Sequence, residues 1–336
     1  MGIPVISSWT AADIVPTDHP LYIGRIGLFG DRAANKAVQA ADFLLVIGCR
    51  LSIPQIGHRV ELFAKDARIA MVDIDQAELD KPTLRIWQKI REDAGSFIRR
   101  ALAIPAEQGV DQWVKLCQSW KARYAMAAEK RDGFTSFAFI EELCDALPKD
   151  AVVVTDMGAS FTCTFQAAKT KMGQRWITAS GHAPMGYGLP GAIGAAYQTG
   201  RRVVCVTGDG GLMMNLQELA QVAGANLPIT IFVLNNGGYL TMKHTQRNHF
   251  GRLTGADKAS GLHMPNWARI ANSFGLQYTR FTHGKDVLSM PSPLLAEVMM
   301  DPDQPLIPRV QTTKNADGTL RGGLLEDMYP PLMESA

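Results

Sequence analysis

Apolar runs and amphipathic stretches take turns along the first hundred residues. The runs PVISSW, FLLVIGC and ARIAMVDID have the length and apolar character of buried strands, whereas RAANKAVQAA and HRVELFA have helical spacing. Strands that alternate with helices in this way predict a parallel sheet covered by helices. We therefore expect a Rossmann-like α/β domain over residues 1–104.

The same alternation starts again in the second half of the chain. A helix is predicted at FTSFAFIEELCDALP, followed by strands at AVVVTD, RRVVCVTGD and ITIFVLNN, a helix at MPNWARIANSFG and a strand near PLIPRV. The amphipathic run EQGVDQWVKLCQSWKARYAMAAEKR predicts a connecting helix within residues 105–132. The expected fold is α/β, with two domains whose parallel sheets are flanked by helices. The second domain is expected over residues 133–330, and the Pro-rich end LLEDMYPPLMESA is expected on the surface.

Composition and charge exclude several classes of protein. The chain has 336 residues and a net charge of +2, with Lys and Arg spread along it, so no nucleic-acid footprint appears. The five cysteines lie far apart without metal or redox spacing, which fits reduced thiols in a cytoplasm. No apolar run approaches the roughly 18 residues of a membrane span. We expect a cytoplasmic protein with neither nucleic acid nor membrane as a partner.

Two of the apolar runs end in polar residues. The strand VVCVT is followed by Asp209 among glycines, and the strand ITIFVL is followed by Asn235 and Asn236. Between them, Asn215 and Glu218 have the spacing of a capping box, which predicts a helix that starts there. A strand, a helix and a strand within about 30 residues form a right-handed crossover unit with parallel strands. Asp209 and Asn236 are therefore expected at the same edge of the sheet, where open α/β sheets bind ligands.

The residue types at this edge suit a magnesium ion. One carboxylate, one amide oxygen and a nearby backbone carbonyl are oxygen ligands of the kind that Mg²⁺ prefers, and Mg²⁺ usually shares its shell with phosphate oxygens and water. Gly208, Gly210 and Gly211 would let backbone amides approach an anion closely. The pattern predicts a site for a magnesium-diphosphate ligand.

Simpler interpretations exist for each feature taken singly. Asp209 could be a plain helix cap, and the asparagine pair could be a plain turn. Their pairing across one strand-helix-strand unit favours a shared site instead. A P-loop is excluded because no Gly-x-x-x-x-Gly-Lys-Ser/Thr occurs. The segment GRIGLFG invites a dinucleotide interpretation, but its glycines do not have the spacing Gly-x-Gly-x-x-Gly.

The motif GDG, followed at this distance by NN, resembles the diphosphate-binding motif of thiamine diphosphate enzymes. The segment ITASGHAPMGYGLPGAIGAA is similar to the one that precedes this motif in acetolactate synthase and its relatives. HPLYIGRIGLFGDRAANKAVQAADFLLVIGCRL and VDIDQAEL are similar to the central domain of the same superfamily. The ending PLIPRVQTTKNADGTLRGGLLEDMYP resembles acetolactate-synthase-like proteins of surface-polysaccharide gene clusters. The resemblance covers nearly the whole chain.

The resemblance assigns roles to particular residues. It implies that Asp209, Asn236 and the carbonyl of Gly238 bind Mg²⁺, and that Gly210 and Gly211 contact the diphosphate through their backbone. Met185 matches the large apolar residue that props the cofactor into a bent shape, which makes proton removal intramolecular. The carbonyl of Ala183 would face the aminopyrimidine, at a position where the family usually has glycine. The loop against the diphosphate would be formed by Gly158, Ala159 and Ser160.

Three further side chains lie in or near these motifs. His182, His244 and Gln246 could face the reacting centre or could make structural hydrogen bonds. Relatives differ in whether they bind FAD, another nucleotide or nothing against the central domain, so FAD stays open as a second cofactor beside thiamine diphosphate and Mg²⁺.

The resemblance begins partway through the central domain. The pyrimidine-binding domain, which carries a glutamate that acts on the cofactor's pyrimidine ring, has no counterpart in the sequence. We expect that domain on a missing N-terminal region or on a separate chain, within a homo-oligomer. The truncated central domain favours a fragment over a split gene.

The reaction class implied by the resemblance is cleavage of a 2-oxo acid, most simply pyruvate, with decarboxylation followed by protonation or carboligation. The alternatives are a non-catalytic relic that holds Mg²⁺-diphosphate and a nucleotide-binding oxidoreductase built on GRIGLFG. The presence of Asp209, Met185 and Asn236 favours the enzyme lineage over both.

Overall fold

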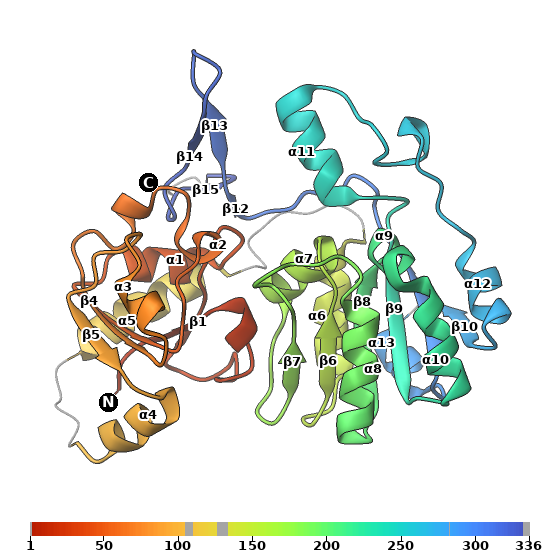
Figure 1. Ribbon diagram of the computed structural model, residues 1–336, viewed down its shortest axis with the longest axis horizontal. Coiled ribbons are helices and arrows are strands. Elements are labelled where there is room, and N and C mark those ends of the chain that lie inside the picture. The colour runs from red at the N-terminus through yellow and green to blue at the C-terminus, as the bar shows by residue number, and fades with distance from the viewer. Residues whose placement is uncertain (1, 105–109, 126–133, 282, 332–336) are drawn as a thin grey trace. The chain divides into compact units, whose positions relative to one another are not determined.

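The computed structural model describes residues 2–104, 110–125, 134–281 and 283–331 (Figure 1). The chain forms two compact units. The first consists of Met1–Ser8, His19–Glu129 and Ile307–Ala336, and the second of Trp9–Asp18 and Lys130–Leu306. No helix within the described ranges is both long and apolar enough to cross a membrane.

The first unit contains two small parallel sheets. One pairs β1 (Val5–Ser7) with β2 (Tyr22–Arg25), and the other has the order β3-β4-β5 (Phe43–Ile47, Arg68–Asp73, Gln88–Arg91). Its helices are α1 (Arg32–Gln39), α2 (Ile53–Ile56), α3 (Gln76–Asp80), α4 (Ala94–Leu102) and α5 (Asp111–Arg123). The parallel α/β character of this unit was predicted. The helix predicted at HRVELFA was wrong, because only a 3₁₀ turn forms at Val60–Leu62.

The C-terminal segment folds back onto the first unit. It contains the short antiparallel pairs β12 with β15 (Arg309–Val310, Met328–Tyr329) and β13 with β14 (Thr312–Lys314, Leu320–Gly322). Asn35 of α1, fully buried, donates from Nδ2 to the carbonyl of Leu325 over 3.0 Å. Leu325 and Met328 are each 3% exposed, so the surface location predicted for this end is wrong for these two residues.

The second unit is built on a six-stranded parallel sheet of order β10-β11-β9-β8-β6-β7. The strands are β6 (Val152–Thr155), β7 (Arg175–Ile177), β8 (Val203–Gly208), β9 (Ile229–Asn235), β10 (Gln277–Arg280) and β11 (Leu294–Met299). The helices are α6 (Ser136–Ala146), α7 (Ala159–Ala167), α8 (Gly188–Thr199), α9 (Asp209–Leu212), α10 (Leu219–Gly224), α11 (Leu240–Phe250), α12 (Trp267–Ser273) and α13 (Gly284–Ser289).

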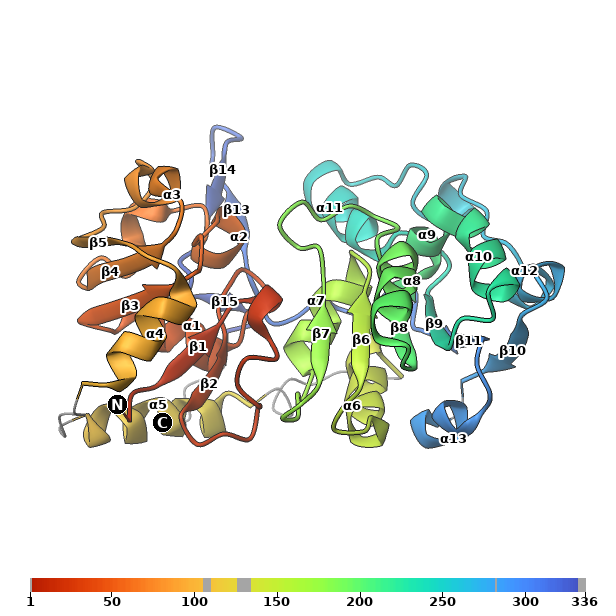
Figure 2. The same ribbon diagram turned by 60° about the horizontal axis from the view of Figure 1, so that its bottom comes forward.

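Helices cover both faces of this sheet (Figure 1 and Figure 2). Leu189 of α8, Val222 of α10 and Trp267 of α12 pack in one core with the inward side chains of β6, β8 and β9. On the other face, Phe139 of α6 contacts the ring of Phe232 of β9, with ring centroids 5.3 Å apart. Because both faces are covered, β8 and β9 are continuously apolar until they reach the edge of the sheet.

The compact units divide the chain differently from the predicted domain boundaries. The segment from Ile307 belongs to the first unit, although it was predicted within the second domain, and Trp9–Asp18 belongs to the second unit. Trp9 packs edge-on against Phe161 of α7, with ring centroids 5.0 Å apart. The predicted connecting helix is observed as α5, which packs with α1 and β2 of the first unit. The rest of that predicted run, residues 107–109 and 126–131, lies outside the described residues.

Candidate functional site

The parallel strands β8 and β9 end side by side, as predicted from their spacing. Gly208 at the end of β8 is in register with Leu234 of β9. Asp209 follows directly and is the first residue of α9. The backbone amide of Gly238 donates to Oδ2 of Asp209 over 2.9 Å, and the amide of Gly210 donates to Oδ1 over 2.8 Å. The GDG and NN segments therefore form one local site in the second unit.

The two asparagines of the NN pair have different surroundings. Asn235 is held within the fold, because its Nδ2 donates to Oε1 of Glu297 over 2.6 Å and its Oδ1 accepts from the amide of Gly237 over 3.0 Å. Asn236 is 7% exposed, and its Oδ1 is buried without a hydrogen-bond partner. A buried acceptor without a partner costs free energy unless a ligand satisfies it. Asn236 is therefore the residue of the pair that fits a metal ligand.

The oxygens at this edge fit a magnesium ion. Asp209 supplies a carboxylate and Asn236 supplies an amide oxygen that lacks a partner. Within the described ranges, no group of three or more His, Cys, Asp or Glu could hold a metal. A cation here would therefore depend on a mixed set of carboxylate, amide and backbone oxygens, with further oxygens from water or a phosphate, which is typical of Mg²⁺.

Burial raises the pKa of Asp209 to about 6, although backbone amides donate to its carboxylate and oppose the shift. Asp209 is 1% exposed. Burial disfavours the charged form of a carboxyl group unless a cation neutralises it. A divalent cation would stabilise the charged form and remove this cost.

Glycines surround the carboxylate because side chains would not fit. A Cβ added at Gly210 would lie 2.2 Å from the ring of Tyr239, and one at Gly238 would lie 2.1 Å from the carbonyl oxygen of Ala256. Gly238 also has φ +155°, a backbone conformation that L side chains rarely adopt. At Gly208, in contrast, an added Cβ would meet nothing within 4 Å. Gly210 and Gly238 are thus required by packing, whereas Gly208 leaves open space beside the site.

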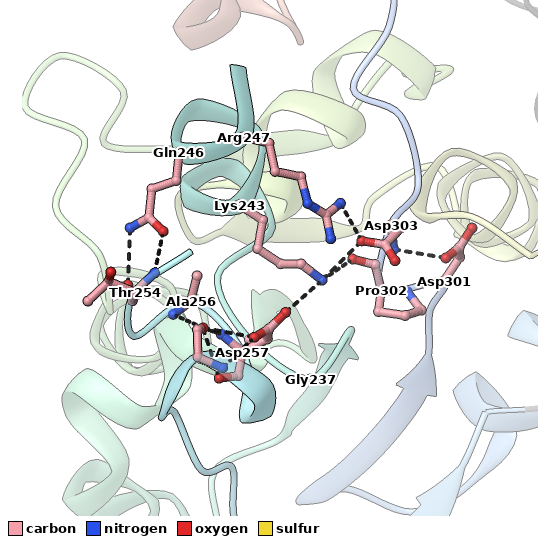
Figure 3. A network of polar contacts seen from close by, with 12 residues as sticks. Gly237, Lys243, Gln246, Arg247, Thr254, Ala256, Asp257, Asp301, Pro302 and Asp303 are labelled. Atoms are coloured by element: carbon pink, nitrogen blue, oxygen red, sulfur yellow. Dashed lines mark hydrogen bonds and ion pairs between the residues drawn. The ribbon is translucent and has the colours of Figure 1, made fainter. Parts of the chain in front are cut away.

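A network of polar contacts holds the segment that follows the NN pair (Figure 3). Lys243 of α11 is 3% exposed, and its Nζ donates to the carbonyl of Pro302 over 2.9 Å. The same Nζ lies 3.1 Å from Asp303 and 3.5 Å from Asp257. Asp257 in turn forms an antiparallel β-bridge with Gly238. The network therefore links α11 and the turn after β11 to the backbone at Gly238.

The predicted diphosphate loop lies between β6 and α7. Gly158 has φ +78° and precedes Ala159, the first residue of α7. An added Cβ at Gly158 would lie 3.9 Å from Oγ1 of Thr241, so this loop faces the start of α11. Ser160 is 1% exposed, and its hydroxyl donates to the carbonyl of Met157 over 2.8 Å. The Ser160 hydroxyl is thus used within the fold, and only its backbone is suited to a ligand contact.

Ala183 and Met185 lie in the exposed segment before α8. Met185 is 41% exposed, whereas Gly186 next to it is buried. Met185 is therefore not part of the hydrophobic core of the second unit. Ala183 has φ +52°, which is unfavourable for any residue except glycine. The local backbone therefore has the conformation that the usual glycine of the family would adopt without strain.

The predicted capping box at Asn215 is wrong. The helical segment already begins at Asp209, and Asn215 lies inside a 3₁₀ stretch with non-helical φ −135° and ψ 36°. Its Nδ2 donates instead to the carbonyl of Gly186 over 2.9 Å. A tertiary hydrogen bond has replaced the local cap that the spacing suggested.

Of the three further side chains in or near the motifs, two make structural hydrogen bonds. Nε2 of His244 lies 2.9 Å from the carbonyl oxygen of Gln304. Gln246 bonds the backbone of Thr254 twice, through Nε2 to its carbonyl and through Oε1 from its amide. His182 is exposed beside Ala183.

The GRIGLFG loop of the first unit is closed by its own contacts. The amide of Gly27 donates to Oδ1 of Asn35 over 3.0 Å, and the amide of Gly30 donates to the carbonyl of Gly27 over 2.9 Å. These two amides are therefore not available to a dinucleotide phosphate. A cavity of about 660 Å³ lies in the same unit, lined in part by Arg32, Lys36 and Glu326, and its lining includes none of the predicted site residues.

Family models and curated proteins match most of the chain. Residues 1–100 match the family "Thiamine pyrophosphate enzyme, central domain", and residues 156–302 match "Thiamine pyrophosphate enzyme, C-terminal TPP binding domain". The chain is 31% identical over 317 residues to the acetolactate synthase isozyme 1 large subunit of Escherichia coli (strain K12), covering 92% of this chain and 56% of that protein. It is 30% identical over 329 residues to the probable acetolactate synthase large subunit of Methanocaldococcus jannaschii, covering 91% of this chain and 54% of that protein.

The chain thus belongs to the thiamine pyrophosphate enzymes and is related to acetolactate synthase large subunits. It spans about half the length of the curated relatives that it matches. The candidate site at Asp209 and Asn236 falls within the part that matches the TPP-binding domain.

Proposed function

We propose that this chain provides the magnesium- and diphosphate-binding part of a thiamine diphosphate-dependent 2-oxo acid decarboxylase or carboligase of the acetolactate synthase type. The observation that carries the proposal is the buried, unpartnered Oδ1 of Asn236 in the turn whose Gly238 amide bonds the buried carboxylate of Asp209. The match to the TPP-binding domain over residues 156–302 supports the same ligand.

In this proposal, Asp209, Asn236 and the carbonyl of Gly238 hold Mg²⁺, which binds the diphosphate. The backbone at Gly210 and Gly211 is proposed to contact the diphosphate, and glycine is needed at both positions because a side chain would clash with Tyr239 or Asp156. The backbone of Gly158, Ala159 and Ser160 faces the diphosphate from the start of α7. Thiamine diphosphate, when bound, supplies the electron sink for cleavage of the bond next to a 2-oxo acid's carbonyl group.

Met185 is proposed to support the bent cofactor. Its side chain is 41% exposed and is therefore free of the core. The carbonyl of Ala183 would orient the aminopyrimidine. The chain's residues thus bind and orient, whereas the carboxyl group that acts on the pyrimidine ring is expected from a pyrimidine-binding domain on another part of the protein or on a partner chain.

Two alternatives compete with this function. A non-catalytic relic would hold Mg²⁺-diphosphate without need of Met185, and a nucleotide-binding oxidoreductase would use the GRIGLFG loop. The exposed Met185 favours the thiamine diphosphate enzyme over the relic. The internal hydrogen bonds of Gly27 and Gly30 count against the oxidoreductase.

Thermal unfolding in the presence of ligands tests the proposal. Mg²⁺ and thiamine diphosphate together should raise the unfolding temperature, because a ligand that binds only the folded state stabilises it. Either component alone should have a smaller effect, and NAD should have none. A shift with NAD but not with Mg²⁺ and thiamine diphosphate would contradict the proposed function.

A further inference from the structure

Gly186, the residue after Met185, is held on both sides of its backbone. Its amide donates to Oδ1 of Asp156 over 2.8 Å, and its carbonyl accepts from Nδ2 of Asn215 over 2.9 Å. Gly186 has φ +86°, and an added Cβ would lie 2.7 Å from Cβ of Met214 and 2.8 Å from Nδ2 of Asn215. Only glycine fits between these partners in this conformation.

Asp156 joins four segments through one carboxylate. It follows β6, is 1% exposed and accepts from the amides of Met157 and Gly186. Its Oδ2 accepts from the hydroxyl of Thr207 on β8 over 2.7 Å, two residues before Asp209. The amide of Gly188 at the start of α8 is a further donor. Burial is the largest influence on this carboxyl and raises its pKa, so these donors offset a substantial desolvation cost.

The packing around this carboxylate leaves little freedom. An added Cβ at Gly211 of α9 would lie 2.6 Å from Oδ2 of Asp156, and one at Gly188 would lie 2.9 Å from Cβ of Asp156. The helix that begins at Asp209 and the segment that carries Met185 are thus packed against the same side chain. A shift of one would require a shift of the other.

Asn215 completes the connection from the opposite side. It lies at the break between α9 and α10, where its non-helical backbone lets the side chain reach the carbonyl of Gly186. A regular helix through this position would place the side chain elsewhere. The non-helical backbone at Asn215 therefore allows its hydrogen bond to the carbonyl of Gly186.

We propose that Asp156 and Asn215 are positioning residues that clamp Gly186 and thereby hold Met185 at the cofactor's ring portion. The inference rests on the proposed function. The clamp sets the distance between the diphosphate site at Asp209 and the support under the rings, so that thiamine diphosphate is bound bent rather than extended. The hydrogen bond from Asn215 to Gly186 has no role in binding the diphosphate itself.

The test compares two ligands on the whole 336-residue chain carrying Asn215→Ala, with Gln221→Ala on the neighbouring α10 as a matched control. Titration calorimetry measures the affinity for thiamine diphosphate and for inorganic diphosphate, each with Mg²⁺. Asn215→Ala should weaken thiamine diphosphate binding by about tenfold, the size of effect that one lost hydrogen bond supplies. Its affinity for inorganic diphosphate should not change, and Gln221→Ala should change neither.

Hydrogen exchange in the absence of ligand provides an independent measurement. Amides of residues 180–187 should exchange faster in Asn215→Ala, while those of β8 and β9 keep their protection. Asp156→Asn should also speed exchange at residues 180–187, because an amide group would face backbone donors. Parallel losses for both ligands, or unchanged affinities with unchanged exchange, would overturn the clamp. Absence of thiamine diphosphate binding by the unmodified chain would instead overturn the proposed function.

Discussion

The amide of Gly238 donates to Oδ2 of Asp209 over 2.9 Å, although the two residues are 29 positions apart in the chain. This bond fixes the turn after β9 against the start of α9. It also directs the Gly238 peptide at the carboxylate that is proposed to bind Mg²⁺. The arrangement couples the shape of the turn to the metal site, and it follows that small changes in the turn should affect metal binding.

Gly238→Ala should damage both the fold of the turn and the metal site. The added Cβ would lie 2.1 Å from the backbone oxygen of Ala256 at φ +155°, so the turn must move. We expect a loss of roughly 2–4 kcal/mol in the free energy of unfolding, in the range of strongly unfavourable backbone and packing changes. Gly194→Ala in α8, where an added Cβ meets nothing within 4 Å, is the matched control and should be neutral or stabilising. Denaturant unfolding of the two variants measures the difference; equal stabilities would show that the turn is not constrained.

Ala183→Gly should stabilise the protein. Ala183 has φ +52°, where an L residue is strained by about 1–2 kcal/mol, and glycine removes this strain from the folded state. Glycine also makes the unfolded chain more flexible, which lowers the free energy of unfolding by roughly 0.4–1 kcal/mol. A net gain of about 0.5–1 kcal/mol is expected, because the side chain makes no buried contact that would be lost. Denaturant unfolding is again the measurement. A destabilised Ala183→Gly would mean that the methyl group has a packing role.

Stabilisation by Mg²⁺ and thiamine diphosphate should depend on pH through Asp209. Burial raises its pKa from 3.8 to about 6 in the folded protein without metal. This group therefore opposes folding above about pH 6, and the penalty fades as pH falls towards about 4. Metal binding needs the carboxylate, so the ligand-induced rise in unfolding temperature should be full near pH 8 and decline below about pH 6. Unfolding scans with and without ligands across this range provide the test, and a pH-independent ligand effect would exclude Asp209 as the titrating ligand.

This chain assayed alone should not consume pyruvate. Met185 and Ala183 can orient the cofactor, but a carboxyl group must also act on the pyrimidine ring, and by resemblance that group lies on the pyrimidine-binding domain. With saturating Mg²⁺ and thiamine diphosphate, turnover is expected only when the pyrimidine-binding domain of a relative is added. Clear turnover by the chain alone would show that the catalytic carboxyl group lies within these 336 residues.

The sequence predicted the elements whose pattern is local. β6, β8 and β9 are continuous apolar runs, and their parallel arrangement followed from the helix between β8 and β9. β11 was missed because Glu297 interrupts its apolar run; in the fold Glu297 is 6% exposed and accepts from Asn235. The residues most difficult to predict were Asp156 and Asn215. Their partners lie about 30 and 50 positions away, so only the assembled sheet brings them together.

The most direct test of the account is titration calorimetry of thiamine diphosphate with the unmodified chain and with Asp209→Asn, each in Mg²⁺ and in EDTA. Asn keeps the size of Asp209 but places an amide group where Gly210 or Gly238 donates, so the variant should lose about 1–2 kcal/mol of stability and remain folded. We predict binding only for the unmodified chain in Mg²⁺. Asp150→Asn, which changes an exposed carboxylate outside the site, should bind as the unmodified chain does. Equal, metal-dependent binding by a folded Asp209→Asn variant would contradict the assignment of the site.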